Sequence, residues 1–170
     1  MLSFAGVRIN QNNLYDYLKS HKDEIEAALK AEDRDRIQSI DEIRKDGHKV
    51  LVKATQLDRN GNPKSVNILS INCRAANIYS EIFSEERILL DRYIVLNVNE
   101  LFEHNIIDSK GLVYALHGDT SEDSWSADYT LFGVFSDFKT ASKIASEKQS
   151  SISAFYMDEK TSIYIGGYSE

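Results

Sequence analysis

Two apolar runs, separated by an acidic loop, dominate the last third of the chain. Residues 112–116 read LVYAL and residues 129–135 read YTLFGVF, and both are rich in side chains that favour strands. Between residues 111 and 138 the chain has no lysine or arginine. Five acidic residues fall in that range: Asp119, Glu122, Asp123, Asp128 and Asp137. The segment predicts two strands joined by a strongly negative loop.

The residues after this segment predict one helix and further strands. Ser136 is placed to cap a helix that runs to about residue 147, with Phe138, Ala141 and Ile144 facing inward. Residues 152–157 and 162–168 then predict two strands. We therefore expect a C-terminal antiparallel sheet with one helix packed on it.

The N-terminal half predicts a short strand followed by two helices. Residues 3–9 suit a strand, and Asn12 or Asn13 is placed to cap a helix over residues 14–29, which carries apolar residues at helical spacing. A second helix is expected from Ile37, Ile40 and Ile43, three residues apart, and it would end near Gly47. These segments form the expected N-terminal helical pair.

A β-hairpin is expected between residues 50 and 71. Residues 50–55 alternate in the two-residue period of a strand, residues 66–71 are rich in strand formers, and DRNGNP lies between them. Asp58, Asn60 and Asn62 also match the first ligand positions of a calcium-binding loop. That interpretation fails because Pro63 stands where glycine is required and Leu69 where a glutamate is required.

The middle of the chain predicts a helix over residues 73–86, a buried strand over 93–98 and a short helix after Asn99. The fold class is therefore α+β: N-terminal helices plus a β-hairpin, then the C-terminal antiparallel sheet with its packed helix. A chain of 170 residues suits one domain, and sub-domains of 1–107 and 108–170 are the alternative.

The run Gly133, Val134, Phe135 and Ser136, with a helix containing Ala141 after it, resembles a strand–GVFS–helix–strand arrangement of small uncharacterised bacterial and phage domains. The resemblance covers about residues 112–168. It implies a fold fragment and a bacterial or phage origin, and it provides no catalytic residues.

The charge distribution argues against nucleic-acid binding. The net charge is −7, and the whole excess lies in residues 86–170, which hold seven basic and fourteen acidic residues. A negative surface repels phosphates, whereas it suits a basic protein. Cys73 is the only cysteine, which excludes an intrachain disulfide, and no run approaches the ~18 apolar residues of a membrane span. A cytoplasmic protein without membrane contact is expected.

No motif for catalysis or cofactor binding is evident. The four histidines are scattered without zinc-site spacing, and phosphate-binding glycine loops are missing from the sequence. Cys73, His117 and Asp119 can be drawn as a catalytic set, but a lone cysteine is more often a small buried side chain. We predict no cofactor, no metal site and no catalytic residues.

The acidic loop is the best candidate site, and three interpretations of it remain open. Its carboxylates could hold a divalent ion, it could be a plain solvated loop, or it could bind a partner. Trp125 and Tyr129 favour a partner, since exposed aromatic residues often anchor interfaces. The predicted partner-binding residues are Asp119, Glu122, Asp123, Trp125, Asp128 and Tyr129.

The leading hypothesis is a non-catalytic protein-binding accessory or inhibitor protein, of the kind a phage directs at a host protein with a basic surface. One alternative is a small divalent-metal-dependent hydrolase or nucleotide-binding protein that uses the carboxylates of residues 119–128. Another is a structural or self-assembling protein, with the strand expected at residues 162–168 as its contact.

Overall fold

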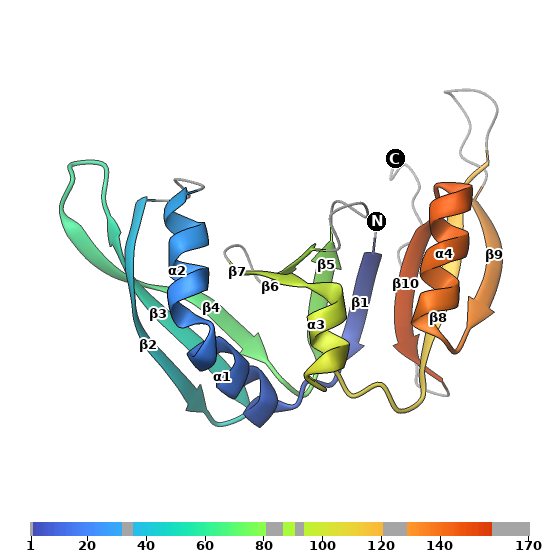
Figure 1. Cartoon of the computed structure of the whole chain (residues 1–170), viewed down its shortest axis with the longest axis horizontal. Coiled ribbons are helices and arrows are strands. Elements are labelled where there is room, and N and C mark those ends of the chain that lie inside the picture. Colours follow the sequence, from blue (N-terminus) through green and yellow to red (C-terminus); the bar gives the residue numbers. More distant parts are fainter. Residues whose placement is uncertain (1, 32–35, 81–86, 91–93, 121–128, 158–170) are drawn as a thin grey trace, which may run out of the picture.

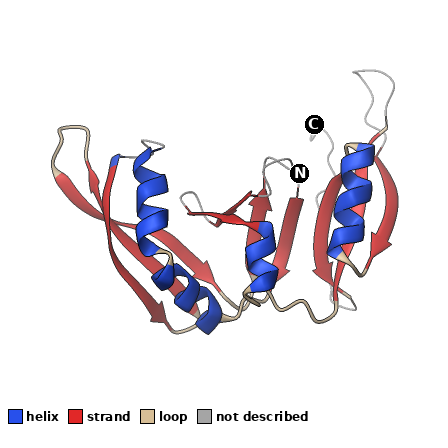
Figure 2. Ribbon diagram, viewed as in Figure 1, coloured by secondary structure: helices blue, strands red, loops and turns tan. Residues whose placement is uncertain are grey.

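The computed structural model describes residues 2–31, 36–80, 87–90, 94–120 and 129–157. The fold is α+β, as predicted, and it contains two sheets (Figures 1 and 2). A seven-stranded sheet has the order β7-β6-β5-β1-β10-β8-β9, and a three-stranded sheet has the order β2-β3-β4. In Figure 1 the three-stranded sheet with its two helices lies at one end of the molecule, and β8, β9 and β10 lie at the other.

The N-terminal strand β1 (Leu2–Val7) lies inside the larger sheet. It pairs in parallel with β10 (Ser151–Tyr156) and antiparallel with β5 (Ala76–Ser80). The predicted strand is therefore present, and it joins strands from the middle and the end of the chain. Leu2 and Phe4 of β1 are both buried.

Two helices follow, α1 (Gln11–Ser20) and α2 (Lys22–Ala31), where one helix was predicted. Asn10 caps α1, because its side chain accepts a hydrogen bond from the Asn13 amide at 3.2 Å. His21 separates the two helices. Leu14, Leu18 and Leu29 are buried as their spacing predicted.

The predicted helix over Ile37, Ile40 and Ile43 is wrong, because these residues belong to strand β2 (Ile37–Asp46). β2 pairs antiparallel with β3 (Lys49–Leu57), and the ladder has irregularities between Ile37 and Ser39 and between Ile40 and Glu42. Each adds one residue to β2, so isoleucines three apart lie opposite Gln56, Ala54 and Val52, which all belong to one face of β3. The three-residue spacing thus came from β-bulges.

The predicted hairpin is confirmed in β3 and β4 (Pro63–Asn72), which pair from Lys49 opposite Asn72 to Leu57 opposite Pro63. Its turn uses the Asp58 carboxylate, which accepts hydrogen bonds from the amides of Asn60 and Asn62, both at 2.8 Å. These bonds, above all the one from Asn62, lower the pKa of Asp58. The carboxylate therefore stabilises the turn.

The helix predicted over residues 73–86 is wrong for its described part. Residues 76–80 form strand β5. Beside β5 lies β6 (Arg87–Leu90), and β7 (Ile94–Asn97) is the edge strand of the sheet on that side. Ile78 is fully buried and lies opposite Phe4 of β1. Pairing with β1 therefore decided the structure of a segment whose apolar spacing also suited a helix. The short helix predicted after Asn99 is present as α3 (Val98–Glu103).

In the C-terminal part the two strands around the acidic loop, the helix and the strand after it are present as predicted, but they belong to the seven-stranded sheet, where β10 pairs in parallel with β1. β8 (Leu112–Asp119) pairs antiparallel with β9 (Tyr129–Phe135) and with β10, and α4 (Phe138–Lys148) packs on them. The helix cap is Asp137, one residue after the predicted Ser136, since its carboxylate accepts a 2.7 Å hydrogen bond from the Thr140 amide. The strand predicted at residues 162–168 lies outside the described residues.

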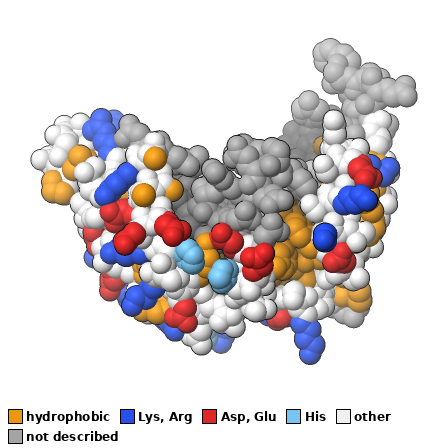
Figure 3. All heavy atoms as spheres, viewed as in Figure 1, with side chains coloured by type: hydrophobic (Ala, Val, Ile, Leu, Met, Phe, Trp, Pro, Cys, Tyr) orange, Lys and Arg blue, Asp and Glu red, His pale blue; other side chains and the backbone are white. Residues whose placement is uncertain are grey.

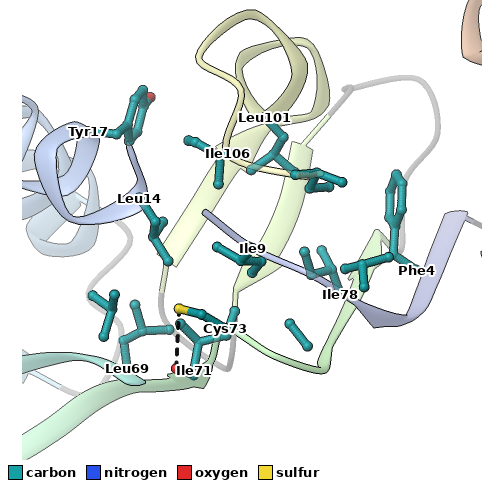
Figure 4. Packing of buried hydrophobic residues seen from close by; sticks show 14 of the residues in the cluster. Phe4, Ile9, Leu14, Tyr17, Leu69, Ile71, Cys73, Ile78, Leu101 and Ile106 are labelled. Atoms are coloured by element: carbon teal, nitrogen blue, oxygen red, sulfur yellow. Dashed lines mark hydrogen bonds between the residues drawn. The ribbon is translucent and has the colours of Figure 1, made fainter. Parts of the chain in front are cut away.

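One hydrophobic core runs through both sheets. Figure 4 shows its middle, where Leu14 of α1, Leu69 of β4, Ile78 of β5 and Leu101 of α3 lie around Ile9. Cys73 is part of this core, with 5% of its surface exposed, and burial raises the pKa of its thiol. It is a small buried side chain, as expected.

Candidate functional site

The β8–β9 hairpin carries the acidic loop. Asp119 ends β8, Tyr129 begins β9, and the two residues lie opposite each other in the ladder. One residue further on, the Thr120 and Thr130 hydroxyls share a 3.0 Å hydrogen bond. The hairpin therefore holds both ends of the loop at the edge of the seven-stranded sheet. Glu122, Asp123, Trp125 and Asp128 lie outside the described residues, so their role stays a prediction.

The strand beside the loop exposes a row of apolar side chains. Tyr129, Leu131 and Val134 of β9 are 39%, 62% and 52% exposed. Leu131 lies opposite His117, and Val134 lies opposite Ala115, so both point to one face of β8–β9. We call Tyr129, Leu131 and Val134 the β9 row. Only Tyr129 was predicted as a site residue.

A β-bulge creates the β9 row. The ladder is irregular between Leu116 and His117, which lie opposite Gly133 and Leu131, so Phe132 is an extra residue. Without it, alternation would place Leu131 and Val134 on opposite faces of the sheet. The bulge is a signal that sequence reasoning missed, because an uninterrupted strand was predicted there.

The other face of β9 is covered by α4. Phe135 lies opposite Tyr114, whose ring is 5.3 Å from that of Phe138 in α4, and the Lys148 ammonium lies 5.1 Å from the Phe132 ring centroid. A Cβ atom on Gly118 would be 3.2 Å from Phe132 Cε2, so glycine allows this ring to lie close to β8. The hairpin therefore has one aromatic face covered by α4, and on its other face the β9 row is exposed while Ala115 and His117 of β8 are buried.

A line of polar side chains crosses the sheet on the face of the β9 row. The His117 Nε2 and Ser153 Oγ atoms share a 2.8 Å hydrogen bond, and Ser153 Oγ lies 3.3 Å from Ser3 Oγ. Burial lowers the pKa of His117, which favours the neutral imidazole. A serine hydroxyl bonded to a neutral histidine is also the arrangement of a nucleophile and its base. Ser153 is only 4% exposed, however, and the line joins β8, β10 and β1, which is a structural role.

A second polar cluster lies between α1 and α3, where Tyr17, His21, Glu100 and His104 meet. The Tyr17 ring stacks on His21 with 4.1 Å between centroids, and it meets the edge of His104 at 5.1 Å. The Tyr17 hydroxyl donates a hydrogen bond to the Glu100 carboxylate. Burial and this bond raise the pKa of Tyr17, so the hydroxyl keeps its proton. Figure 3 shows histidine and acidic side chains gathered on this face.

Sequence reasoning missed this cluster, because its members are far apart in the chain. His21 and His104 were described as scattered, yet their ring centroids are 6.2 Å apart. Within the described ranges, no group of three or more His, Cys, Asp or Glu side chains is arranged to hold a metal ion. The main contribution of the cluster is to attach α1 to α3.

Comparisons with known proteins returned no match, whether with family models, curated proteins or solved structures. The resemblance of residues 112–168 to GVFS-containing domains therefore stays a prediction. In the part of the chain that the structure describes, no helix has the length and apolar character that crossing a membrane requires. The fold and the site define the class of protein: it is an α+β protein with an acidic hairpin loop and an exposed apolar strand beside that loop.

Proposed function

We propose that this protein is a non-catalytic protein-binding module, an accessory or inhibitor protein that recognises a partner with a basic surface. The acidic residues of the 119–128 loop attract and orient the partner, and apolar contacts at Trp125 and Tyr129 hold it. The supporting observation is that the two ends of this segment, Asp119 and Tyr129, lie in the hairpin that forms the edge of the sheet, where Tyr129 and Leu131 are exposed.

Charged and apolar surfaces contribute differently to such binding. A segment of one charge sign raises the association rate with an oppositely charged partner, and it suppresses binding of acidic proteins. Charges that stay in water add little affinity, so most binding energy has to come from buried apolar and aromatic contacts. The hairpin offers both, since a continuous one-signed segment flanks the exposed side chains of β9.

The test compares two variants that carry the same change in net charge. One replaces Asp119, Glu122, Asp123 and Asp128 by Asn or Gln, and the control does the same at Asp16, Asp23, Glu103 and Glu147. A partner is captured with the wild-type chain, purified, and its affinity for each variant is measured at low and high salt.

We expect the loop variant to lose about 10-fold in affinity at low salt and to show a flatter salt dependence, because the steering charges are gone. The control variant should bind like the wild type. Equal affinity of wild type and loop variant, or equal losses in both variants, would contradict the proposal.

A further inference from the structure

The edges of the two sheets differ in how they are protected. The outer strands of the three-stranded sheet carry the features that block further pairing: β2 contains Asp41, Glu42, Arg44, Lys45 and Asp46, and β4 begins with Pro63 and Lys64. Charges and proline on edge strands prevent association with other chains. β9 is also an edge strand, but its sequence YTLFGVF contains neither, and only the bulge at Phe132 interrupts it.

The β9 row makes this uncharged edge apolar as well. Leu131 and Val134 expose 62% and 52% of their surface on the face opposite α4. Among the described residues, no strand pairs with the outer side of β9. A long uncharged edge strand with exposed apolar side chains is a template for another strand.

A second copy of the same strand fits this edge. When two β9 strands pair antiparallel around a two-fold axis perpendicular to the sheet, the same face of both copies points the same way. The two β9 rows then become cross-strand neighbours, with six apolar side chains in one patch. No charged residue of either β9 enters the contact.

The acidic loops do not oppose this arrangement. Each loop precedes the first residue of β9, so antiparallel pairing places the two loops at opposite ends of the shared ladder. Seven residues of fully overlapping strand separate them by roughly 23 Å. That distance is well beyond the Debye length of about 8 Å at physiological salt, so repulsion between the loops is weak.

We propose that β9 is a dimerisation edge, at which two copies of this chain join antiparallel into one continuous sheet. The proposal does not depend on a partner for the acidic loop, although the dimer would present two such loops. A contact of one strand pair and six side chains belongs among small interfaces of less than ~1,200 Å² in total, so a weak, concentration-dependent dimer is expected.

The experiment is light scattering coupled to size-exclusion chromatography at concentrations from about 1 μM to about 500 μM, which brackets weak association. We expect the wild-type average mass to rise towards that of two chains. Leu131→Lys and Val134→Lys, measured separately, should each shift the midpoint at least about 10-fold towards higher concentration, because each charge would be buried at the new ladder.

Met157→Lys is the matched control, since Met157 is an equally exposed apolar residue (59%) outside β9. It should dimerise like the wild type. Hydrogen exchange provides a second measurement: amides of β9 should gain protection with concentration in the wild type and in Met157→Lys only. A wild-type chain that is monomeric throughout would overturn the proposal, as would dimers that survive both β9 substitutions or are lost in Met157→Lys. Circular dichroism confirms folding, and if one β9 variant unfolds the other decides.

Discussion

Strands β2 and β9 both contain β-bulges, but apolar side chains beside the bulges are buried in β2 and exposed in β9. In β2 the added residues bring Ile37 and Ile40 to the core side, where each is at most 3% exposed, and leave the charged residues in water. In β9 the added Phe132 turns towards α4, and Leu131 and Val134 stay in water. A β-bulge therefore sets which face a side chain reaches, and the neighbouring element determines whether that side chain is covered.

The largest expected effect compares the two strands directly. Ile40→Ala should lower the free energy of unfolding by about 3 kcal/mol, since it removes a fully buried side chain and leaves a cavity. Leu131→Ala should change it by less than about 0.5 kcal/mol, because an exposed side chain loses little on truncation. Urea unfolding at a protein concentration that keeps the chain monomeric measures both changes in unfolding free energy. Similar losses in the two variants would contradict the difference between β2 and β9.

A second prediction concerns the covered face of β9. Gly118→Val should destabilise by about 2 kcal/mol, because its side chain would collide with Phe132. Phe132→Leu in the same chain should recover part of this loss by making space. A double-mutant cycle of unfolding free energies measures the coupling, and additive effects would show that the two positions do not touch.

A third prediction separates the observed helix cap of α4 from the predicted one. Asp137→Ala should lower the unfolding free energy, since it removes the acceptor of the Thr140 amide. Ser136→Ala, the neighbouring control, should have little effect. Hydrogen bonds from Thr140 lower the pKa of Asp137, so this contribution is present at neutral pH and is lost as pH falls through the acidic range. A larger loss for Ser136→Ala would reverse the assignment.

The smallest expected effect concerns His117, opposite Leu131. Burial lowers its pKa in the folded state, so the unfolded chain binds more protons and protonation favours unfolding. Stability should therefore decrease as pH falls from 7 to 5, a window above the titration of most carboxyl groups. His117→Gln should flatten this dependence. An identical slope in the wild type and the variant would show that His117 is not responsible.

Local patterns were sufficient for several elements. The alternation of residues 50–55 and the turn at Asn60 and Gly61 predicted the β3–β4 hairpin, and the apolar runs at 112–116 and 129–135 predicted β8 and β9. The helix after Asp137 was predicted to within a residue or two of its ends. In each case the residues that specify the element lie within it, so no distant partner was needed.

The same reasoning failed where one spacing suits two structures. Ile37, Ile40 and Ile43 are spaced as in a helix, and so are Ala76 and Tyr79, but these residues belong to strands β2 and β5. Pairing with β3 and with β1 supplied backbone hydrogen bonds that the apolar spacing does not encode. Two of the predicted site residues, Asp119 and Tyr129, are described by the structure, and they lie at the two ends of the loop. The exposure of Leu131 and Val134 was not predicted.

Composition and neighbours a few residues apart were sufficient to specify the class of the fold, the β3–β4 and β8–β9 hairpins and the one-signed segment. Long-range contacts in the folded chain place β1 between β5 and β10, bring His21 to His104, and leave Leu131 and Val134 exposed on the same face. Strand order and ring contacts join residues distant in the chain, and one extra residue in a ladder reverses which side the following residues face.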